Sequence, residues 1–316
     1  MKVKQRTLSQ SFSLEGKGLH TGCNVKITFY PAPDNHGYKI RRSDLSGMPV
    51  INALAENVVY RQRCTVLTQN GAEVSTVEHV LAALYGCEID NCLLDINGSE
   101  FPILDGSSIQ FVKKIKEAGV TEQKSYRKYI ELKRKRIRVK DEESGSSLLL
   151  LPDESFSIQV RIVFDSKLLK IQDAYMDNLS SFVKDFSQAR TFVFVKEVVS
   201  LLDAGLIKGG DLDNAIIIYD KPMEQGEYDF LADTLGIKHR NAAKLGYIMN
   251  RPLIYDNEPA RHKLLDVIGD LALTGSFIKG KIIADCPGHK INTLFAKAIR
   301  EASVLNKEMK IENKII

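Results

Sequence analysis

The chain has 316 residues, of which 44% are hydrophobic and 27% are charged. This length and composition are typical of a globular protein with one large or two medium-sized domains. The formal net charge of +4 suits an anionic small molecule as well as it suits nucleic acid. No apolar run reaches the roughly 18 residues of a spanning helix, so the sequence predicts no stable membrane insertion.

The cysteines and the N-terminus indicate the compartment. The five cysteines are odd in number and form no CxxC pair, a pattern that favours free thiols in a reducing environment. They are Cys23, Cys64, Cys87, Cys92 and Cys286. Residues 1–6 lack the apolar stretch of a signal peptide. We therefore expect a cytoplasmic protein.

The first part of the chain alternates strand and helix patterns. Residues 25–30 alternate apolar and polar side chains, which predicts a strand, and residues 92–96 predict another. Residues 76–85 place apolar side chains at helical spacing. Residues 108–118 predict a second helix, which Gly119 ends. The expected order is strands, helix, strand, helix.

A polar junction at residues 121–147 separates this part from a second one with a similar order of elements. That repetition predicts two α+β domains, residues 1–125 and 126–300, followed by a polar C-terminal tail at 301–316. Residues 221–258 carry few regularly spaced apolar side chains, so we expect loop with short helices there. In the second part the predicted strands are 147–151, 157–163, 215–219 and 281–284, and the predicted helices are 195–204 and 260–274.

His262 and Asp266 stand four residues apart in a strongly helical stretch, so their side chains share one face of the helix. An imidazole and a carboxylate that converge there can share a metal ion, and Asp270 continues the same face as an outer partner. With His79 they supply two imidazoles and a carboxylate, the ligand set of a catalytic zinc site with an open position. The alternative is a hydrogen bond on the helix surface.

Four other positions have both a chemical and a structural interpretation. Glu78 can act as an acid or base, or it can close a capping box with Ser75. His289 follows a strand and a Pro-Gly turn, where catalytic groups and ordinary surface histidines both occur. Thr191 can donate to an oxyanion or cap the next helix. Gly209–Gly210 can approach a phosphate or form a turn.

The stretch from Lys133 to Lys140 is the most basic in the chain, and its composition resembles a nucleic-acid-binding patch. Ile137 and Val139 alternate with the charges, however, which is typical of an exposed strand face. We favour the strand and expect no nucleic-acid partner. A nucleic-acid-binding protein remains the alternative, with salt-dependent binding and no metal.

Ordered motifs along the chain are similar to those of one known family. The motifs are Lys4-Gln-Arg-Thr-Leu8, Gly16-Lys-Gly-Leu-His-Thr-Gly22, Ser75-Thr-Val-Glu-His79, Ile89-Asp-Asn91, Phe101-Pro-Ile-Leu-Asp-Gly-Ser107, Ala189-Arg-Thr-Phe192, Arg261-His-Lys-Leu-Leu-Asp-x-Ile-Gly-Asp270 and Gly288-His289. Together they resemble the UDP-3-O-acyl-N-acetylglucosamine deacetylases, the zinc amidases that commit Gram-negative bacteria to lipid A synthesis. The similarity runs from residue 4 to about residue 300.

The resemblance implies a fold, a cofactor and a substrate. The fold is α+β, with two α/β-sandwich domains of similar topology, each with an insert, and the active site between them. One zinc ion per chain is held by His79, His262 and Asp266. The substrate is UDP-3-O-acyl-N-acetylglucosamine. A zinc hydrolase of another amide, which would have no passage for an acyl chain, is the alternative.

The resemblance also implies roles for single residues. Glu78 is the general base, and His289 is the general acid that protonates the leaving amine, oriented by Asp270. Thr191 polarises the amide carbonyl or holds the oxyanion, and Lys263 meets the diphosphate. The second insert, near residues 192–217, forms an apolar acyl passage. Its expected substrate contacts are Leu19 at the mouth, Phe192 at the sugar nucleotide, and Phe194, Val195, Ile207, Gly210 and Leu212 along the passage.

Two departures from the family pattern stand out. The region around residues 133–141 offers no clear second phosphate-binding lysine. Residues 221–258 are longer than usual between the second insert and the zinc helix. In some relatives with such an insertion a hydroxyacyl-carrier-protein dehydratase domain follows the deacetylase, so we expect that such a domain can be this chain's partner.

Overall fold

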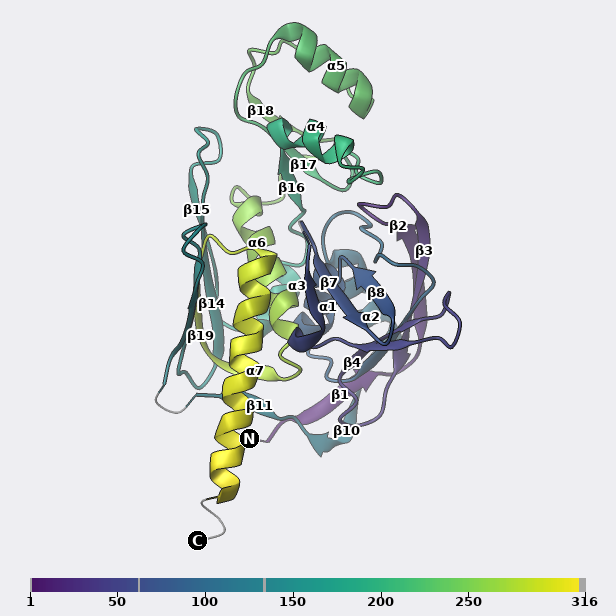
Figure 1. Cartoon of the computed structure of the whole chain (residues 1–316), viewed down its shortest axis with the longest axis vertical. Helices are drawn as coiled ribbons and strands as arrows, with labels where there is room; N and C mark the ends of the chain where they lie inside the picture. The colour runs from purple at the N-terminus through teal and green to yellow at the C-terminus, as the bar shows by residue number, and fades with distance from the viewer. Residues whose placement is uncertain (1, 62, 133–134, 313–316) are drawn as a thin grey trace.

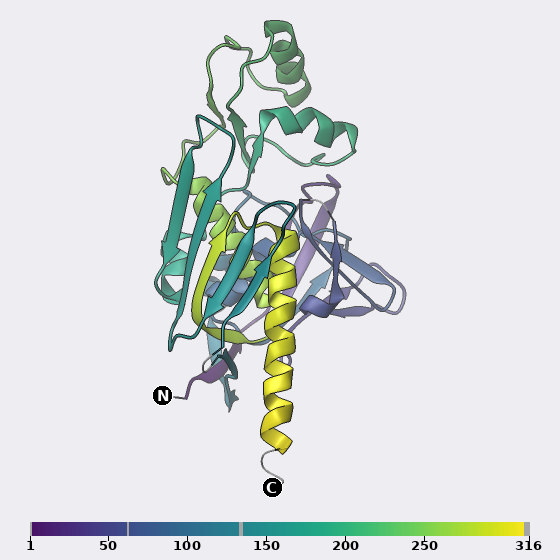
Figure 2. The same ribbon diagram turned by 60° about the vertical axis from the view of Figure 1, so that its left-hand side comes forward.

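The computed structural model describes residues 2–61, 63–132 and 135–312. The fold is α+β, and two large sheets face each other across a central group of helices (Figures 1 and 2). A smaller lobe with strands and helices of its own stands at the top of Figure 1. No helix in the described ranges combines the length and the apolar character that crossing a membrane requires.

The first large sheet has five strands in the order β2-β3-β9-β4-β5, and β4 runs parallel to β9. Their bounds are β2 Phe12–Lys17, β3 Asn24–Pro31, β4 Tyr38–Arg42, β5 Val50–Asn52 and β9 Cys92–Ile96. The inward side chains of β3, such as Ile27 and Phe29, are fully buried. Phe111 of α2 (Ile109–Ala118) packs on Phe29, with ring centroids 6.1 Å apart, so that the helix covers one face of the sheet.

The second large sheet has the strand order β12-β13-β19-β14-β15, with β11 added beside β19. Their bounds are β11 Tyr129–Glu131, β12 Ile137–Lys140, β13 Ser147–Leu151, β14 Phe156–Val163, β15 Ile171–Met176 and β19 Phe277–Asp285. Helix α6 (Glu258–Ala272) packs on β14 and β15, and α7 (His289–Glu312) packs on β12 and β13. The central strands are apolar because helices cover them.

Helices α1 (Glu78–Gly86) and α6 cross at the centre of the molecule, and almost every residue of both is buried. Gly269 allows the close approach. A Cβ atom at that position would lie 2.0 Å from the carbonyl oxygen of Glu78, inside any permitted contact distance. Any other residue would therefore push the two helices apart. This crossing brings the segment that follows Ser75 against the helix that carries His262 and Asp266.

The small lobe is a three-stranded sheet, β16-β17-β18, with two helices. Its elements are β16 Phe192–Phe194, α4 Val195–Asp203, β17 Ile216–Tyr219, α5 Gln225–Leu235 and β18 Gly246–Ile248. A further sheet, β6-β7-β8, lies near α1. Its strands are β6 Val58–Tyr60, β7 Thr65–Gln69 and β8 Ala72–Ser75; the remaining short helices are η1 Ala55–Asn57, η2 Leu179–Ser181 and α3 Phe182–Asp185.

The predicted strands and helices are all present, with ends that differ by a few residues. Three strands lie largely or wholly within the polar junction at 121–147, where none but the basic strand was expected: β10 (Val120–Tyr126), β11 and β12. Strand β10 pairs with β1 (Lys4–Leu8) in a two-stranded ribbon whose exposed face needs no apolar run. The division between residues 125 and 126 remains a prediction.

The C-terminal part differs from the expectation of a tail. Helix α7 starts at His289 and continues to Glu312, so residues 301–312 are helical, and residues 313–316 lie outside the described ranges. Within 221–258 a short helix, α5, was expected, and strand β18 was not. All five cysteines lie in described parts of the chain, and all are free thiols, as predicted.

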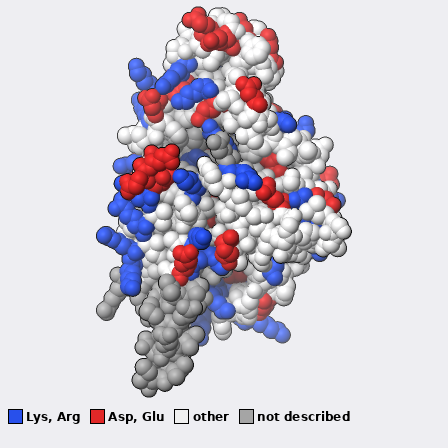
Figure 3. Space-filling model, in the orientation of Figure 1, with Lys and Arg blue, Asp and Glu red and all other residues white. Residues whose placement is uncertain are grey.

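The basic stretch contains β12, in which exposed Arg138 and Lys140 alternate with half-buried Ile137 and Val139. Its first two residues, 133 and 134, lie outside the described ranges. Lys140 pairs with Glu142 at 2.7 Å. Acidic and basic side chains are interspersed over the face of the molecule in Figure 3. The pattern of an exposed strand face is therefore confirmed for the part of the stretch that is described.

Candidate active site and metal centre

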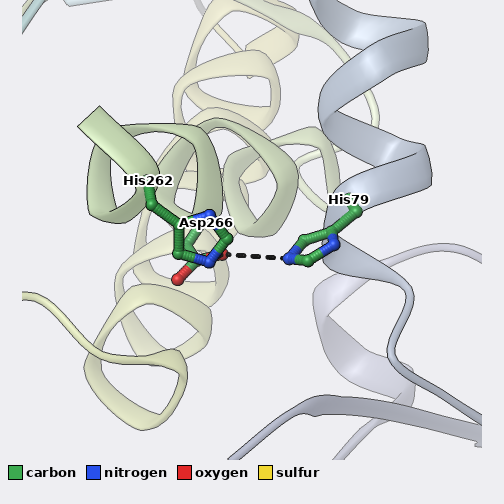
Figure 4. Close-up of side chains that lie close together, drawn as sticks. All are labelled: His79, His262 and Asp266. Atoms are coloured by element: carbon green, nitrogen blue, oxygen red, sulfur yellow. Dashed lines mark ion pairs between the residues drawn. The ribbon is translucent and has the colours of Figure 1, made fainter. Parts of the chain in front are cut away.

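His79, His262 and Asp266 converge where α1 meets α6. One potential ligand atom from each residue lies within 4.8 Å of the others, and all three side chains are buried. Asp266 Oδ1 is 3.4 Å from His262 Nε2 and 3.7 Å from His79 Nε2. Figure 4 shows His262 and Asp266 on one helix, facing His79 on the other. The structure thus brings the three predicted ligands together.

The donor atoms of this cluster fit a cation. Burial lowers the pKa of His79 to about 3, and burial also lowers that of His262, so both imidazoles are neutral. His262 Nδ1 lies 3.0 Å from the carbonyl oxygen of Ala189. Because a carbonyl only accepts, Nδ1 carries the hydrogen, and the lone pair on Nε2 faces the Asp266 carboxylate.

The buried carboxylate of Asp266 also fits a bound cation. Its Oδ1 is buried and has no hydrogen-bond partner among the described residues, although it faces the imidazole lone pair of His262. Burial acts to raise the pKa of Asp266, but nearby cationic groups outweigh it, with Lys263 Nζ only 2.9 Å from Oδ2, and they hold that pKa well below the usual range, so the group is ionised. A buried anion beside lone pairs is costly unless a cation lies between them. The residues present therefore suit a divalent metal ion.

Glu78 precedes His79 at the start of α1 and is almost fully buried. Its Oε2 accepts a hydrogen bond of 3.1 Å from the backbone N–H of Thr65. Burial raises the pKa of Glu78 to about 7, against the opposing effect of His289. The capping-box interpretation was wrong: Val77 occupies the N-cap position, and Ser75 belongs to β8. The side chain of Glu78 is thus free for other chemistry.

His289 and Asp270 form the other side of the site. His289 Nδ1 lies 3.0 Å from Asp270 Oδ2, and the Asp270 side chain is fully buried. The other nitrogen, Nε2, lies 3.9 Å from Glu78 Oε1 and 4.0 Å from Asp266 Oδ2. Asp270 therefore fixes the ring so that Nε2 points to the His79–His262–Asp266 cluster. Asn292 Nδ2 also donates to Asp270 Oδ2, at 2.9 Å.

The charge state of His289 follows from its carboxylate neighbours. Burial alone would lower the pKa of His289, but Asp270, Glu78 and Asp266 together raise it to about 9. His289 was expected in a loop, yet it is the first residue of α7. Its ring is therefore held by a long helix as well as by Asp270. A half-buried imidazolium that keeps its proton at neutral pH is suited to act as an acid.

Thr65 belongs to this network, although no sequence pattern indicated it. Its backbone N–H donates to Glu78, and its hydroxyl donates to Asp270 Oδ1 at 2.5 Å. The same hydroxyl lies 3.2 Å from His289 Nδ1. Thr65 opens strand β7 and is 205 residues from Asp270. Only the tertiary fold brings them together, so no local motif could indicate the contact.

A cavity of about 430 Å³ joins the His79–His262–Asp266 cluster to the small lobe. It is lined by charged groups at one end and by apolar side chains of the lobe at the other. The residues predicted from the sequence that line it are Leu19, Glu78, His79, Thr191, Phe192, Ile207, Gly210, Leu212, His262, Lys263, Asp266 and His289. Asp270 lies behind His289. The sequence did not indicate His20 or Arg63, which also line the cavity.

Phe194 and Val195 lie apart from that cavity. Phe194 lines a second cavity of about 290 Å³, since its ring faces Phe164 with centroids 5.1 Å apart. Val195 is buried in the apolar core of the small lobe. Arg63, Phe192 and Lys263 line both cavities. The second cavity therefore adjoins the first at these three residues.

Thr191 and the Gly209–Gly210 turn hold the edges of the large cavity. Thr191 does not cap α4, whose N-cap is Phe194. Its backbone bonds to Gly106 and Ile216, and its side chain lies on the cavity wall. The glycine turn packs on the loop that carries Leu19: Gly209 N–H donates to the Leu19 carbonyl at 3.0 Å, and a Cβ on Gly209 would clash with Gly18.

A buried ion pair fixes the start of α6. Arg190 Nε donates to Glu258 Oε1 at 2.8 Å, and both side chains are almost inaccessible to solvent. Arg190 also donates to the carbonyl oxygens of Arg251 and Pro252. The carbonyl oxygen of Ala189, the residue before Arg190, accepts a hydrogen bond from His262. The Arg190–Glu258 ion pair therefore helps to hold α6, which carries His262 and Asp266, against the segment that lines the cavity.

The sequence matches the family model described as UDP-3-O-acyl N-acetylglycosamine deacetylase over residues 5–240 and 234–301. The chain belongs to this family. The match comes in two parts, and both include residues 234–240. These residues begin at the C-terminal end of α5.

Relatives of two kinds are similar to the chain. The "Bifunctional enzyme LpxC/FabZ" of Porphyromonas gingivalis is 55% identical over 94% of the chain and 64% of the relative. The protein of the same name from Bacteroides thetaiotaomicron is also 55% identical, over 95% of the chain and 65% of the relative. The chain thus spans just under two thirds of these relatives. The "UDP-3-O-acyl-N-acetylglucosamine deacetylase" of Marinobacter nauticus is 36% identical over 94% of the chain and 90% of the relative.

Proposed function

We propose that this chain hydrolyses the N-acetyl group of UDP-3-O-acyl-N-acetylglucosamine and releases acetate, the committed step of lipid A biosynthesis. The observation that carries the proposal is the buried cluster of His79, His262 and Asp266, flanked by Glu78 and His289 at the end of a cavity with apolar walls. The name of the Marinobacter nauticus relative, a UDP-3-O-acyl-N-acetylglucosamine deacetylase, supports the substrate.

The cofactor that we propose is one zinc ion per chain. The ligand types support it, because two neutral imidazoles and a carboxylate that leave one position open are typical of catalytic zinc. Bound there, zinc would supply a Lewis acid that polarises the amide carbonyl and lowers the pKa of water. His262 is preset for this role by its bond to the Ala189 carbonyl, which leaves Nε2 unprotonated.

Two residues divide the proton transfers. Glu78 takes a proton from the attacking water, for which it must be ionised, and the raised pKa makes it a stronger base than a free carboxylate. His289 donates a proton from Nε2 to the leaving amine, while Asp270 holds Nδ1. Water attacks the acetyl carbon, the carbon–nitrogen bond breaks, and acetate and the free amine leave.

Two further residues position the substrate. Thr191 lies on the cavity wall and supplies a hydroxyl for the developing oxyanion. Lys263 lines both cavities, and its Nζ is 2.9 Å from Asp266 Oδ2. An anionic diphosphate at the junction of the two cavities would meet this ammonium group. The apolar lobe end of the large cavity then receives the acyl chain.

Release of acetate from UDP-3-O-acyl-N-acetylglucosamine tests the proposal directly. We expect turnover by the zinc-loaded protein, loss of turnover with a chelator, and recovery when zinc is added. The same assay with UDP-N-acetylglucosamine, which lacks the acyl chain, distinguishes the alternative of a different amide. Equal turnover of the two nucleotides, or no turnover of either, would contradict the proposal.

Replacing His262 with alanine should remove stoichiometric zinc. The substitution leaves only one imidazole and one carboxylate, and a two-ligand site holds zinc weakly. Metal analysis of the purified protein checks this, with His239→Ala as the control, because His239 is exposed and bonds to Asp233 in the small lobe. A full zinc complement in His262→Ala would show that the ligand assignment is wrong.

Ile207→Asn should weaken long-chain substrates more than short-chain ones. Ile207 lines the large cavity with its φ at 52°, a conformation that asparagine tolerates well, so the backbone should persist. Loss of one apolar wall residue should lower kcat/KM for a long-chain substrate by about tenfold. Val199→Asn, on the exposed side of α4, is the control. Equal losses for both chain lengths would show that Ile207 does not line the acyl site.

We also propose a partner activity. The relatives from Porphyromonas and Bacteroides are each named as a bifunctional LpxC/FabZ enzyme. These names support the expectation that a hydroxyacyl-carrier-protein dehydratase can be joined to this deacetylase segment.

A further inference from the structure

The helix α5 brings an apolar stripe to the large cavity. Tyr228, Leu231, Ala232 and Leu235 are spaced i, i+3, i+4 and i+7, so they share one face of the helix. The first three are buried, and Leu235 is half-buried at the end of the stripe. Leu235 and its neighbour Thr234 line the large cavity, which reaches the His79–His262–Asp266 cluster. One end of α5 is thus core, and the other is cavity wall.

The buried part of the stripe packs on the second insert. Tyr228, Leu231 and Ala232 share one apolar core with Val195 and Val198 of α4 and with Ile217 and Tyr219 of β17. This core is separate from the large core between the two main sheets. The lobe therefore folds around its own apolar centre, and α5 closes it on the side opposite the main body in Figure 1.

Polar bonds fix the position of α5 at its start. Gln225 Oε1 accepts from Ala242 N–H at 2.9 Å, and Tyr219 OH donates to the Ala242 carbonyl at 2.5 Å. Strand β18 continues the segment and pairs with β17, with Ile248 opposite Ile217. The segment 220–248 is therefore built into the lobe, and the place where Leu235 meets the cavity is defined by the fold.

The two parts of the family match join at the same place. Both parts include residues 234–240, which begin with the two cavity-lining residues of α5. The join in the match therefore lies where α5 meets the cavity. A change of side chain at a cavity wall alters what the cavity can hold.

We propose that α5 forms the end wall of the acyl pocket and that Leu235 limits the length of the acyl chain. This inference rests on the proposed function, because it takes the 3-O-acyl chain as the occupant of the cavity. The chain enters beside Leu19, passes Ile207 and Leu212, and ends against Leu235. Each methylene that fits adds apolar burial, and the first that does not fit meets α5.

The test measures binding rather than turnover. UDP-3-O-acyl-glucosamines, which are already deacetylated, are titrated by calorimetry into the zinc-loaded protein, in a series of straight acyl chains of increasing length. Affinity should rise by about fourfold per methylene and then stop rising or fall. In Leu235→Ala the turning point should move to longer chains, and in Leu235→Phe to shorter ones.

Leu231→Ala is the matched control. It removes the same atoms from the same helix, but Leu231 is buried in the lobe core and does not line the cavity. It should lower the melting temperature and leave the turning point where it is. A turning point unchanged in both Leu235 variants, or moved equally by Leu231→Ala, would overturn the role of α5.

Failure of the wider proposal gives a different result. If the nucleotides bind with an affinity that does not depend on chain length, the result supports recognition of the sugar nucleotide and contradicts the acyl pocket. If no nucleotide of the series binds, the proposed function fails, and the end wall fails with it. If the turning point shifts in opposite directions in Leu235→Ala and Leu235→Phe, the result supports both the proposed function and the role of α5 as the end wall.

Discussion

Glu78→Gln should lower kcat for deacetylation by about 10²-fold or more, while zinc content and thermal stability stay close to those of the unchanged protein. Glutamine has the same shape and can still accept the hydrogen bond from Thr65 N–H through its side-chain oxygen. It cannot take a proton from water. The substitution therefore separates the chemical role of Glu78 from its structural one.

The dependence on pH gives the same residue a second test. Glu78 acts as a base only when it is ionised, so turnover should rise with pH through the pKa of Glu78. Burial raises that pKa to about 7, and the positive charge of bound zinc acts in the opposite direction. We expect an acid limb in the pH–rate profile below neutrality, and we expect Glu78→Gln to abolish it.

Glu88→Gln is the matched control for both measurements. Glu88 follows the other end of α1, where its side chain pairs with Arg6 and Arg127 and does not line the cavity. It should keep normal turnover and a normal acid limb. Near-normal turnover in Glu78→Gln would show that another group takes the proton.

Much of the fold could be predicted because the central elements are strongly patterned. Strand β14 alternates buried and exposed residues along its second half, and α6 carries apolar residues at helical spacing. Strands β10 and β11 were missed because they lie at edges, where exposed side chains leave no apolar run. Helix α7 was also missed, although Ile291, Phe295 and Ile299 repeat every four residues.

The candidate site could be predicted in part for a similar reason. The spacing of His262 and Asp266 places them on one helical face, so local geometry suffices. His79 lies in a different helix, so spacing along the chain cannot place it beside them, and only its ligand chemistry and a family motif connected it to them. Thr65 has neither signal, because its contact with Asp270 exists only once β7 packs beside α6 and α7. Leu235 was missed because the apolar stripe of α5 is short.

His289→Ala should lower kcat by about 10²-fold or more and leave zinc bound. The leaving amine needs a proton, and the imidazole of His289 directs Nε2 towards the cluster at 3.9 Å from Glu78 and 4.0 Å from Asp266. None of the three proposed ligands is removed. Metal analysis and steady-state kinetics on the same preparation check this, with His36→Ala as the control, since His36 lines a separate cavity.

Asp270→Asn tests how His289 keeps its proton. Three donors converge on the Asp270 carboxylate: the Thr65 hydroxyl, His289 Nδ1–H and the Asn292 amide. Asparagine offers one acceptor oxygen and no negative charge, so it loses the attraction that raises the pKa of His289. The pKa should fall, and the imidazole should lose its proton at a lower pH.

Asp270→Asn should lower the pH at which turnover falls. A general acid works only while protonated, so turnover falls as pH rises through the pKa of His289, which the carboxylates raise to about 9 before zinc acts on it. Zinc lowers this pKa in both proteins, so the comparison is between variants. The basic limb of Asp270→Asn should lie at lower pH than that of the unchanged enzyme. A basic limb that stays in place, or zinc lost from His289→Ala, would show that the acid lies elsewhere or that His289 binds the metal.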